Sequence, residues 1–230
     1  MKRFSHTRAW VFDLDNTLYP ASCNLFAQID QRMGAFIAEH LKLPLDAARK
    51  LQKSYYREYG TTLSGLMAVH GLEPKMFLDY VHDIDVSIVP RSPELAAALK
   101  ALPGKKYIFT NGSRAHAENV AGQLGVLDAF DGLFDIGDCG FVPKPDPSAY
   151  DAFLKAHNVA ACEAAMFEDM PHNLQVPHAL GMVTVLVHSD TYDHPIQREI
   201  KQWVEPPEHV HHMTDDLPGF LQDLRHTLTT

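Results

Sequence analysis

Residues 9–17 read Ala9-Trp10-Val11-Phe12-Asp13-Leu14-Asp15-Asn16-Thr17, a short apolar run followed at once by two aspartates. In a continued strand Asp13 and Asp15 would share one face and repel each other. Aspartate also disfavours strand interiors, so the pattern predicts a buried strand that ends at Phe12 and carries both carboxylates at its tip. A strand that simply ends in an Asx-rich turn would look the same. Residues 9–17 alone leave both interpretations open.

Three later segments favour the interpretation that the end of the first strand carries functional carboxylates. An apolar run over 106–109 is followed by Thr110-Asn111-Gly112-Ser113, and another over 164–167 by Glu168-Asp169. Between them, Val142-Pro143-Lys144-Pro145 places a lysine in a loop that proline restrains on both sides. Open α/β sheets bind ligands beyond the carboxyl ends of their strands. These polar groups are therefore expected to meet at one site.

From residue 91 onward the chain alternates strand-like apolar runs with helical patterns. This alternation predicts a parallel sheet with right-handed crossovers. The expected strands are 106–109, 133–136, 165–168 and 183–187, with 210–213 as a possible short edge strand. The expected helices are 95–102, 114–124, 147–157, 173–180 and 217–228.

Residues 20–90 show helical periodicity and no convincing strand. Leu25, Ile29 and Met33 fall on one helical face, and Pro44 restarts the chain into a second helix that ends at Gly60. Two shorter helices are expected near 63–70 and 74–82. The predicted fold class is therefore α/β, a Rossmann-like parallel sheet with helices on both faces plus an inserted all-helical cap. The core would comprise 1–19 and 91–230, and the cap 20–90.

Composition narrows the class of protein. The 230 residues are 46% hydrophobic, as in ordinary soluble chains, and the net charge of −9 argues against a nucleic-acid polymer as partner. No apolar run approaches the ~18–20 residues of a membrane span, and the first residues lead directly into the first expected strand, so neither a membrane association nor a signal peptide is expected. Cys23, Cys139 and Cys162 form no metal or redox spacing, which favours a cytoplasmic location.

The order Asp-x-Asp-x-Thr, Thr-Asn-Gly, Lys-Pro and Glu-Asp-x-x-x-Asn resembles the motif set of the haloacid dehalogenase (HAD) superfamily of phosphohydrolases. The resemblance extends from about Trp10 to Val187. Within it, the insertion 20–90 resembles a C1-type cap, which closes over the site and excludes large substrates. The resemblance thus implies a small phosphorylated metabolite as substrate, handled by a monomer or homodimer.

Hydrolysis of a phosphate monoester needs a nucleophile, an acid for the leaving oxygen and cations that offset negative charge. The resemblance assigns Asp13 as the nucleophile, which forms an aspartyl-phosphate, and Asp15 as the acid that later activates water. Asp15 also separates the phosphohydrolases from the dehalogenases of the superfamily. Those enzymes lack an aspartate here because a halide leaves without a proton.

The remaining core motifs are expected to bind the phosphoryl group. Thr110 would donate its hydroxyl, and the backbone amides of Leu14 and Asn111 would point the same way, with Gly112 completing the loop. Lys144 would neutralise charge that develops on the phosphoryl group and hold Asp13 ionised.

The resemblance further implies Mg²⁺ as cofactor, which prefers hard oxygen ligands. Asp13 and Asp169 would supply carboxylates, and Asp15 its backbone carbonyl. Glu168 either supports the water shell of the metal or is merely tolerated near a cation. Asn173 is expected to orient the loop that carries Asp169.

Closer resemblance points to the pyrimidine 5′-nucleotidase branch, with UMP or CMP as substrate. The segments that carry it are 12–20, 59–66 and 108–117. A nucleotide base needs a flat apolar surface, and Tyr59 is the candidate, although Tyr55, Tyr56 and Tyr59 would equally suit the core of the cap. His116 follows the second motif and either approaches the substrate or packs locally.

Other functions share these motifs. A phosphatase for a sugar phosphate or phosphoglycolate is one, a sugar phosphomutase that passes its phosphoryl group on is another, and a non-catalytic protein on this scaffold is a third. The histidines His209, His211 and His212 invite a metal site, but no carboxylate or cysteine accompanies them at a familiar ligand spacing, so packing on an edge strand is preferred.

Overall fold

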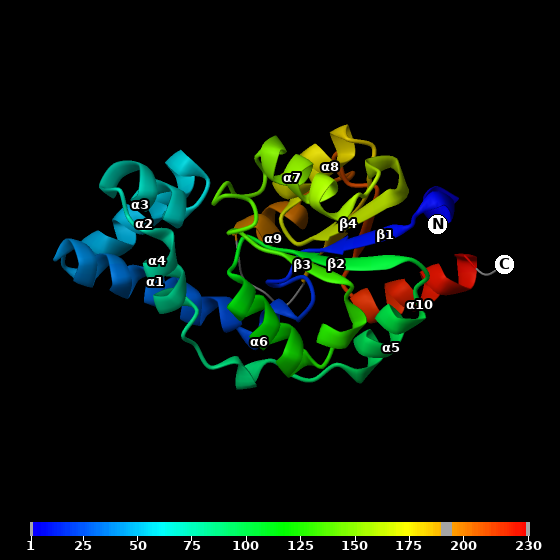
Figure 1. Ribbon diagram of the computed structural model, residues 1–230, viewed down its shortest axis with the longest axis horizontal. Coiled ribbons are helices and arrows are strands. Elements are labelled where there is room, and N and C mark those ends of the chain that lie inside the picture. Colours follow the sequence, from blue (N-terminus) through cyan, green and yellow to red (C-terminus); the bar gives the residue numbers. More distant parts are fainter. Residues whose placement is uncertain (1, 190–194, 229–230) are drawn as a thin grey trace.

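A computed structural model of the protein describes residues 2–189 and 195–228. Its centre is a six-stranded sheet in the order β3-β2-β1-β4-β5-β6, in which every neighbouring pair is parallel (Figure 1). The predicted Rossmann-like parallel sheet is confirmed. The strands are β1 (Ala9–Phe12), β2 (Lys105–Phe109), β3 (Gly132–Phe134), β4 (Ala164–Glu168), β5 (Val183–Val187) and β6 (His212–Thr214).

Helices cover both faces of the sheet. Successive residues of β1 point to opposite faces and all four are buried, so each face needs a layer of helices to cover it. Trp10 and Phe12 pack against α5, α6 and α10, whereas Ala9 and Val11 face the layer that contains α7, α8 and α9 (Figure 1). The bounds are α5 (Pro93–Ala101), α6 (Arg114–Leu124), α7 (Pro147–His157), α8 (Gln175–Ala179), α9 (Pro195–Ile200) and α10 (Leu217–Leu228).

The segment between β1 and β2 is helical, as expected, and lies at one end of the sheet (Figure 1). Its helices are α1 (Leu25–Leu41), α2 (Leu45–Tyr59), α3 (Thr62–His70) and α4 (Pro74–Val81). They bury an apolar cluster of their own that includes Phe36, Leu66 and Phe77. Ile136 and Phe141, which follow β3 in the chain, join this cluster. We call α1–α4 the helical insertion; its division from the rest at residues 20 and 90 stays a prediction.

A few boundaries differ from the expectation. β3 ends at Phe134 rather than residue 136, because the carboxylate of Asp135 accepts bonds from the amides of Arg114 and Asp138 and turns the chain. The edge strand lies at 212–214, and the helix expected from 173 begins at Gln175 after a 3₁₀ turn. The 3₁₀ turns are Lys2–His6, Ala21–Cys23, Val86–Ile88, Leu127–Ala129, Ala161–Glu163 and Pro171–Leu174. Of the helices in the described ranges, none combines the length and apolar character needed to cross a membrane.

Candidate active site

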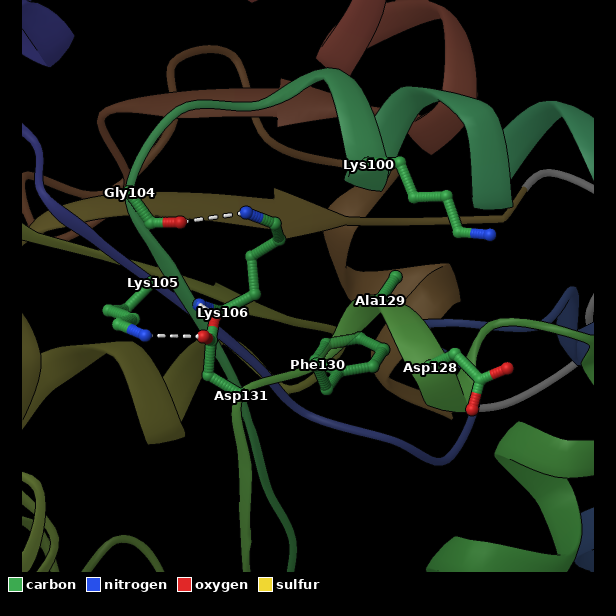
Figure 2. Close-up of a pocket in the computed structure, with 8 residues that line it drawn as sticks. All are labelled: Lys100, Gly104, Lys105, Lys106, Asp128, Ala129, Phe130 and Asp131. Atoms are coloured by element: carbon green, nitrogen blue, oxygen red, sulfur yellow. Dashed lines mark hydrogen bonds and ion pairs between the residues drawn. The ribbon is translucent and has the colours of Figure 1, made fainter.

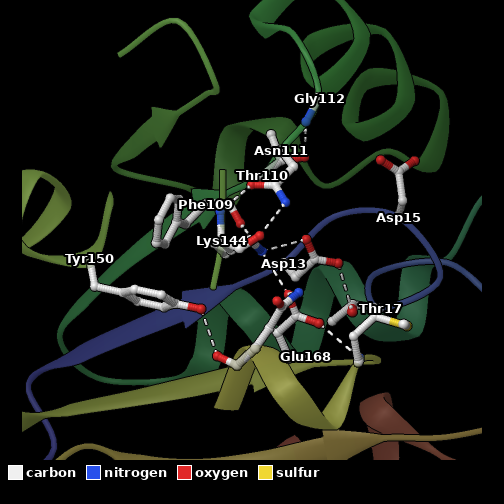
Figure 3. Close-up of polar contacts among 12 residues, drawn as sticks. Asp13, Asp15, Thr17, Phe109, Thr110, Asn111, Gly112, Lys144, Tyr150 and Glu168 are labelled. Atoms are coloured by element: carbon white, nitrogen blue, oxygen red, sulfur yellow. Dashed lines mark hydrogen bonds and ion pairs between the residues drawn. The ribbon is translucent and has the colours of Figure 1, made fainter. Parts of the chain in front are cut away.

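The carboxyl ends of three neighbouring strands meet at one edge of the sheet. The pairing sets Phe12 beside Ile108 of β2 and beside Phe167 of β4. Asp13, Thr110 and Asp169 each follow the last residue of one of these strands. The structure thus brings together the polar groups that the sequence placed in separate motifs (Figure 3).

Asp13 is buried, with 7% of its surface exposed. Its Oδ1 accepts a bond of 2.8 Å from Nζ of Lys144, and its Oδ2 accepts one of 3.0 Å from the hydroxyl of Thr17. Burial raises the pKa of Asp13 to about 7, Lys144 opposes that rise, and the charge of Glu168 adds to it. Thr17, the last residue of the first motif, is therefore a direct partner of the expected nucleophile.

Lys144 uses all three of its ammonium hydrogens within the site. Nζ lies 2.8 Å from Asp13 Oδ1, 2.8 Å from Glu168 Oε1 and 2.9 Å from the carbonyl oxygen of Phe109 (Figure 3). Although burial lowers the pKa of Lys144, the two carboxylates raise it above its usual value. The lysine is therefore charged and held by three bonds, as suits an electrostatic partner of Asp13.

A reciprocal pair of bonds fixes the loop that carries Lys144. The side-chain amide of Asn111 donates to the Lys144 carbonyl at 3.1 Å and its oxygen accepts from the Lys144 amide at 2.8 Å. The sequence suggested only a backbone role for Asn111. Its side chain was missed because the two residues lie 33 positions apart, and no local pattern reports such a contact.

Three acidic residues converge beside this lysine. Oxygens of Asp13, Glu168 and Asp169 all lie within 4.8 Å of one another, and all three residues are buried. Burial raises the pKa of Asp169 well above its usual value, and the charges of Glu168 and Asp13 raise it further. A hard divalent cation would relieve this repulsion, so the donor set fits Mg²⁺.

Glu168 already has partners for both oxygens. Lys144 and the amide nitrogen of Asn173 bind Oε1, and the backbone amide of Met170 binds Oε2. Asn173 therefore acts on Glu168 directly, and its backbone carbonyl also accepts from the Tyr150 hydroxyl at 2.7 Å. These bonds hold the end of β4, from which Asp169 projects.

The loop Thr110–Gly112 lies opposite the acids. The buried hydroxyl of Thr110 accepts a bond of 2.9 Å from the Gly112 amide, which leaves its own hydrogen to donate. Within the described part of the chain, the backbone amides of Leu14 and Asn111 donate to no acceptor. A Cβ at residue 112 would stand 3.1 Å from the His116 ring and 3.3 Å from Thr110 Oγ1, so any larger residue there would require these side chains to shift.

Asp15 stands at the side of this loop. Its Oδ1 accepts from the hydroxyl of Tyr19 at 2.7 Å and from Nε2 of His116 at 2.8 Å. Burial alone would raise the pKa of Asp15, but His116 and Tyr19 together lower it. His116 thus contacts the expected acid, and Tyr19 joins it as a site residue that sequence reasoning missed.

The tyrosines of α2 differ in their surroundings. Tyr55 is buried and its hydroxyl bonds to His70 at 2.6 Å, so it belongs to the core of the helical insertion. Tyr59 is 39% exposed and packs edge-on against Tyr55. Burial and then the charges of Asp169 and Glu168 raise the pKa of Tyr56, a residue that is 46% exposed.

Two other polar groups serve packing. His211 accepts from the backbone amide of Thr184 at 3.1 Å. Among the described residues, the group that could hold a metal ion is Asp13, Glu168 and Asp169. At the amino end of β2, Nζ of the buried Lys106 donates to the carbonyls of Leu102 and Gly104, beside an open surface pocket (Figure 2).

Residues 7–181 match the family model of the haloacid dehalogenase-like hydrolases. The chain is similar to phosphate metabolism protein 8 of Saccharomyces cerevisiae, with 28% identity over 81% of this chain and 63% of the yeast protein. It is also similar to validoxylamine A 7′-phosphate phosphatase of Streptomyces hygroscopicus, with 33% identity over 34% of this chain and 36% of that protein. The chain thus spans less than two thirds of either relative.

Solved structures share the fold over nearly the whole chain. A HAD phosphatase from Thermococcus onnurineus aligns over 96% of this chain and 98% of its own, with a TM-score of 0.62 and 18% identity. An L-2-haloacid dehalogenase from Xanthobacter autotrophicus aligns over 95% and 98%, with a TM-score of 0.59 and 16% identity. At such identities the similarity establishes the fold and does not separate phosphatase from dehalogenase.

Proposed function

The chain belongs to the haloacid dehalogenase-like hydrolases, and from that membership we propose that it is a Mg²⁺-dependent phosphomonoester hydrolase that acts through an aspartyl-phosphate. The observation that carries the proposal is Asp15, whose carboxylate is held at the same strand tip as Asp13 by Tyr19 and His116. A dehalogenase has no use for an acid at this position, because a halide needs no proton. Phosphoryl chemistry needs one.

The reaction follows from these positions. A carboxylate oxygen of Asp13 attacks phosphorus, the bond to the ester oxygen breaks, and protonated Asp15 gives that oxygen its proton. Water then attacks the phosphorus of the aspartyl-phosphate, Asp15 accepts the proton of the water, and phosphate leaves with Asp13 regenerated. Thr110, Lys144 and the free amides of Leu14 and Asn111 would bind the phosphoryl oxygens.

The buried acids supply the reason for a cation. Asp13 and Asp169 would hold Mg²⁺ through their carboxylates and Asp15 through its backbone carbonyl, while Glu168 is occupied by Lys144, Asn173 and Met170. When bound, the metal would offset charge on the phosphoryl group. The names of the yeast and Streptomyces relatives, which both refer to phosphate, support this class of substrate.

We further propose pyrimidine nucleoside 5′-monophosphates, UMP and CMP, as preferred substrates. The helical insertion lies at one end of the sheet (Figure 1) and contacts the core through His82, which stacks on His116. If it encloses the substrate, a single six-membered ring with ribose fits a smaller enclosure than a purine does. Tyr59 was the candidate from sequence for stacking on the base, and Tyr56 is the tyrosine of α2 that the charges of Asp169 and Glu168 affect.

Steady-state kcat/KM values for UMP, CMP, AMP, GMP and a panel of sugar phosphates test the proposal. UMP and CMP should lead, and nucleoside di- and triphosphates should fail. A tenfold advantage of AMP or a sugar phosphate would exclude the nucleotidase and keep the phosphatase. A requirement for a bisphosphate activator, with slow hydrolysis of the intermediate, would identify a phosphomutase instead. Release of no phosphate from any ester would leave a non-catalytic protein.

Two matched substitutions test which tyrosine stacks on the base of the nucleotide. Tyr56→Ala and Tyr59→Ala should each leave turnover of a small aryl phosphate nearly unchanged. The variant that loses UMP turnover by about tenfold or more identifies the stacking residue, since stacking on an aromatic side chain is worth roughly 1–3 kcal/mol per base. Equal loss on both substrates would assign the tyrosine to packing.

A further inference from the structure

His116 is enclosed at the start of α6, with 1% of its surface exposed. Its Nε2 lies 2.8 Å from Asp15 Oδ1, and its Nδ1 has no hydrogen-bond partner within the described part of the chain. An unpartnered polar atom in the interior is unfavourable, and an apolar ring would fill the same space without it. The bond to Asp15 is therefore the advantage that a histidine has over an apolar residue at this position.

This bond gives the two carboxylate oxygens of Asp15 different surroundings. Oδ1 receives both the hydroxyl of Tyr19 and the ring of His116. Oδ2 lies 3.8 Å from the point where a Cβ on Gly112 would stand. Two donors thus hold one oxygen in place and leave the second facing the loop that would bind the phosphoryl group.

The opposite contact of His116 comes from the helical insertion. The ring of His82, directly after α4, stacks on the His116 ring with centroids 4.4 Å apart and an interplanar angle of 11°. Nδ1 of His82 also bonds to the Ser113 hydroxyl at 2.9 Å, and Ser113 caps α6 by accepting the backbone amide of His116. His82 therefore holds both the ring and the helix turn that carries it.

We propose that His116 is a positioning residue that fixes Asp15 for proton transfer, and that His82 makes this position depend on how the helical insertion is seated. The inference rests on the proposed phosphohydrolase function and adds a link from the insertion to the acid. When α4 is seated on the core, the stacked rings hold Asp15 Oδ1. When α4 moves away, the His116 ring loses its support and Asp15 loses its fixed orientation.

Proton transfer matters most for esters with poor leaving groups, so the test compares two substrates. His116→Leu should lower kcat by about tenfold or more on the alkyl phosphate that the enzyme hydrolyses fastest, with KM within about twofold. p-Nitrophenyl phosphate, whose leaving group needs little protonation, should lose less than about threefold. His116→Gln, whose amide nitrogen can reach the place of Nε2, should recover most of the alkyl-ester rate.

The second pair of variants tests the link to the insertion. His82→Ala removes the stacked ring and should lower the alkyl-ester rate between about two- and tenfold, the range expected for one aromatic pair, while the aryl rate holds. His82→Phe restores a ring and should recover the rate. His157→Leu is the matched control. His157 also packs on aromatic rings, and among the described residues its Nε2 has no hydrogen-bond partner and its ring contacts no carboxylate of the site.

Equal losses on the two esters in His116→Leu, or a Gln variant no better than Leu, would overturn the positioning role. If His116→Leu does not fold, the Gln and His82 variants decide by the same ratio of rates. An unchanged ratio in His82→Ala would remove the link to the insertion. Failure of the proposed function is seen separately, because the unmodified protein would then release phosphate from neither ester.

Discussion

The ammonium of Lys144 lies 2.8 Å from the carboxylate of Asp13, although 131 positions separate the two residues in sequence. The same ammonium binds Glu168, so one positive charge serves two of the three buried acids. This shared contact leaves negative charge that a further cation could offset, and it holds the Asp13 carboxylate in one orientation. It also determines what single substitutions should do.

Asp13→Asn should abolish turnover and keep the fold. Asparagine retains an oxygen for the Lys144 ammonium but is not a nucleophile toward phosphorus. Since burial disfavours the charged form of Asp13, its replacement by a neutral group should leave the thermal midpoint unchanged or raise it. Phosphate release and a melting curve test this, and residual activity above a few per cent of wild type would exclude Asp13 as the nucleophile.

Lys144→Met should inactivate the enzyme and destabilise it by about 3–5 kcal/mol, because Asp13 and Glu168 would remain buried without their partner. Lys106→Met is the matched control, since Lys106 is a buried lysine whose ammonium, within the described part of the chain, donates to the backbone carbonyls of Leu102 and Gly104. It should lose about 1–3 kcal/mol and keep its activity. Urea unfolding measures the stability of each variant, and phosphate release measures its activity. Loss of activity in Lys106→Met would show that reduced stability alone explains the inactivity of both variants.

Asp15→Asn should reduce hydrolysis of nucleotides far more than hydrolysis of an activated aryl phosphate. The alkoxide that leaves a nucleotide needs a proton, whereas a nitrophenolate leaves without one. General acid catalysis typically contributes 10²–10⁴-fold, so the nucleotide rate should fall by about a hundredfold or more. The measurement is kcat on the two esters side by side. Similar losses on both would contradict the acid role.

Removal of divalent metal by a chelator should abolish activity reversibly. Oxygens of Asp13, Glu168 and Asp169 lie within 4.8 Å of one another, and their repulsion is reduced by a divalent cation. EDTA should stop phosphate release, Mg²⁺ should restore it, and Ca²⁺ should inhibit because its looser, higher coordination disturbs the in-line geometry. Full activity in EDTA would exclude a metal-dependent mechanism.

Acid should weaken the fold through His82. Burial, aided by the charge of His116, lowers the pKa of His82 from 6.5 to about 3. Between these values the unfolded chain takes up a proton that the folded protein does not, so stability falls as the pH drops through this window. At pH 5 the loss is about 2 kcal/mol.

Unfolding curves at pH 7 and pH 5 for the wild type and His82→Phe test this expectation. The phenylalanine variant should lose less stability between the two values. The exposed His6, changed to Phe, is the control and should behave as the wild type does. Identical pH dependence of wild type and His82→Phe would show that His82 takes no part in acid destabilisation.

The sequence predicts most of the fold because its strands are short, apolar and bounded by turn residues. Strand β5 and helices α6 and α10 have the expected bounds, and β2 and β4 begin one residue early. Helix α9 was not predicted, because its six residues carry too little periodicity. β3 is shortened by the carboxylate of Asp135, a side-chain contact that a hydrophobicity pattern does not contain.

The site is predictable where motifs place a residue at a strand tip, as with Asp13, Thr110 and Asp169. Contacts between distant residues are not. His116 and Asp15 are 101 positions apart, and their bond depends on the packing of α6 beside β1. The role of Tyr59 in stacking on a base stays a prediction.

The order of strands in the sheet has a consequence for biosynthesis. β1 is made first but lies between β2 and β4, which follow it only from Lys105 and Ala164 onward. While the chain is being synthesised, Asp13 and Asp15 therefore leave the ribosome long before the walls that enclose them. A chain stopped by a premature termination codon before Ala164 would carry the nucleophile without Glu168 or Asp169. Incomplete products of translation should thus be catalytically silent.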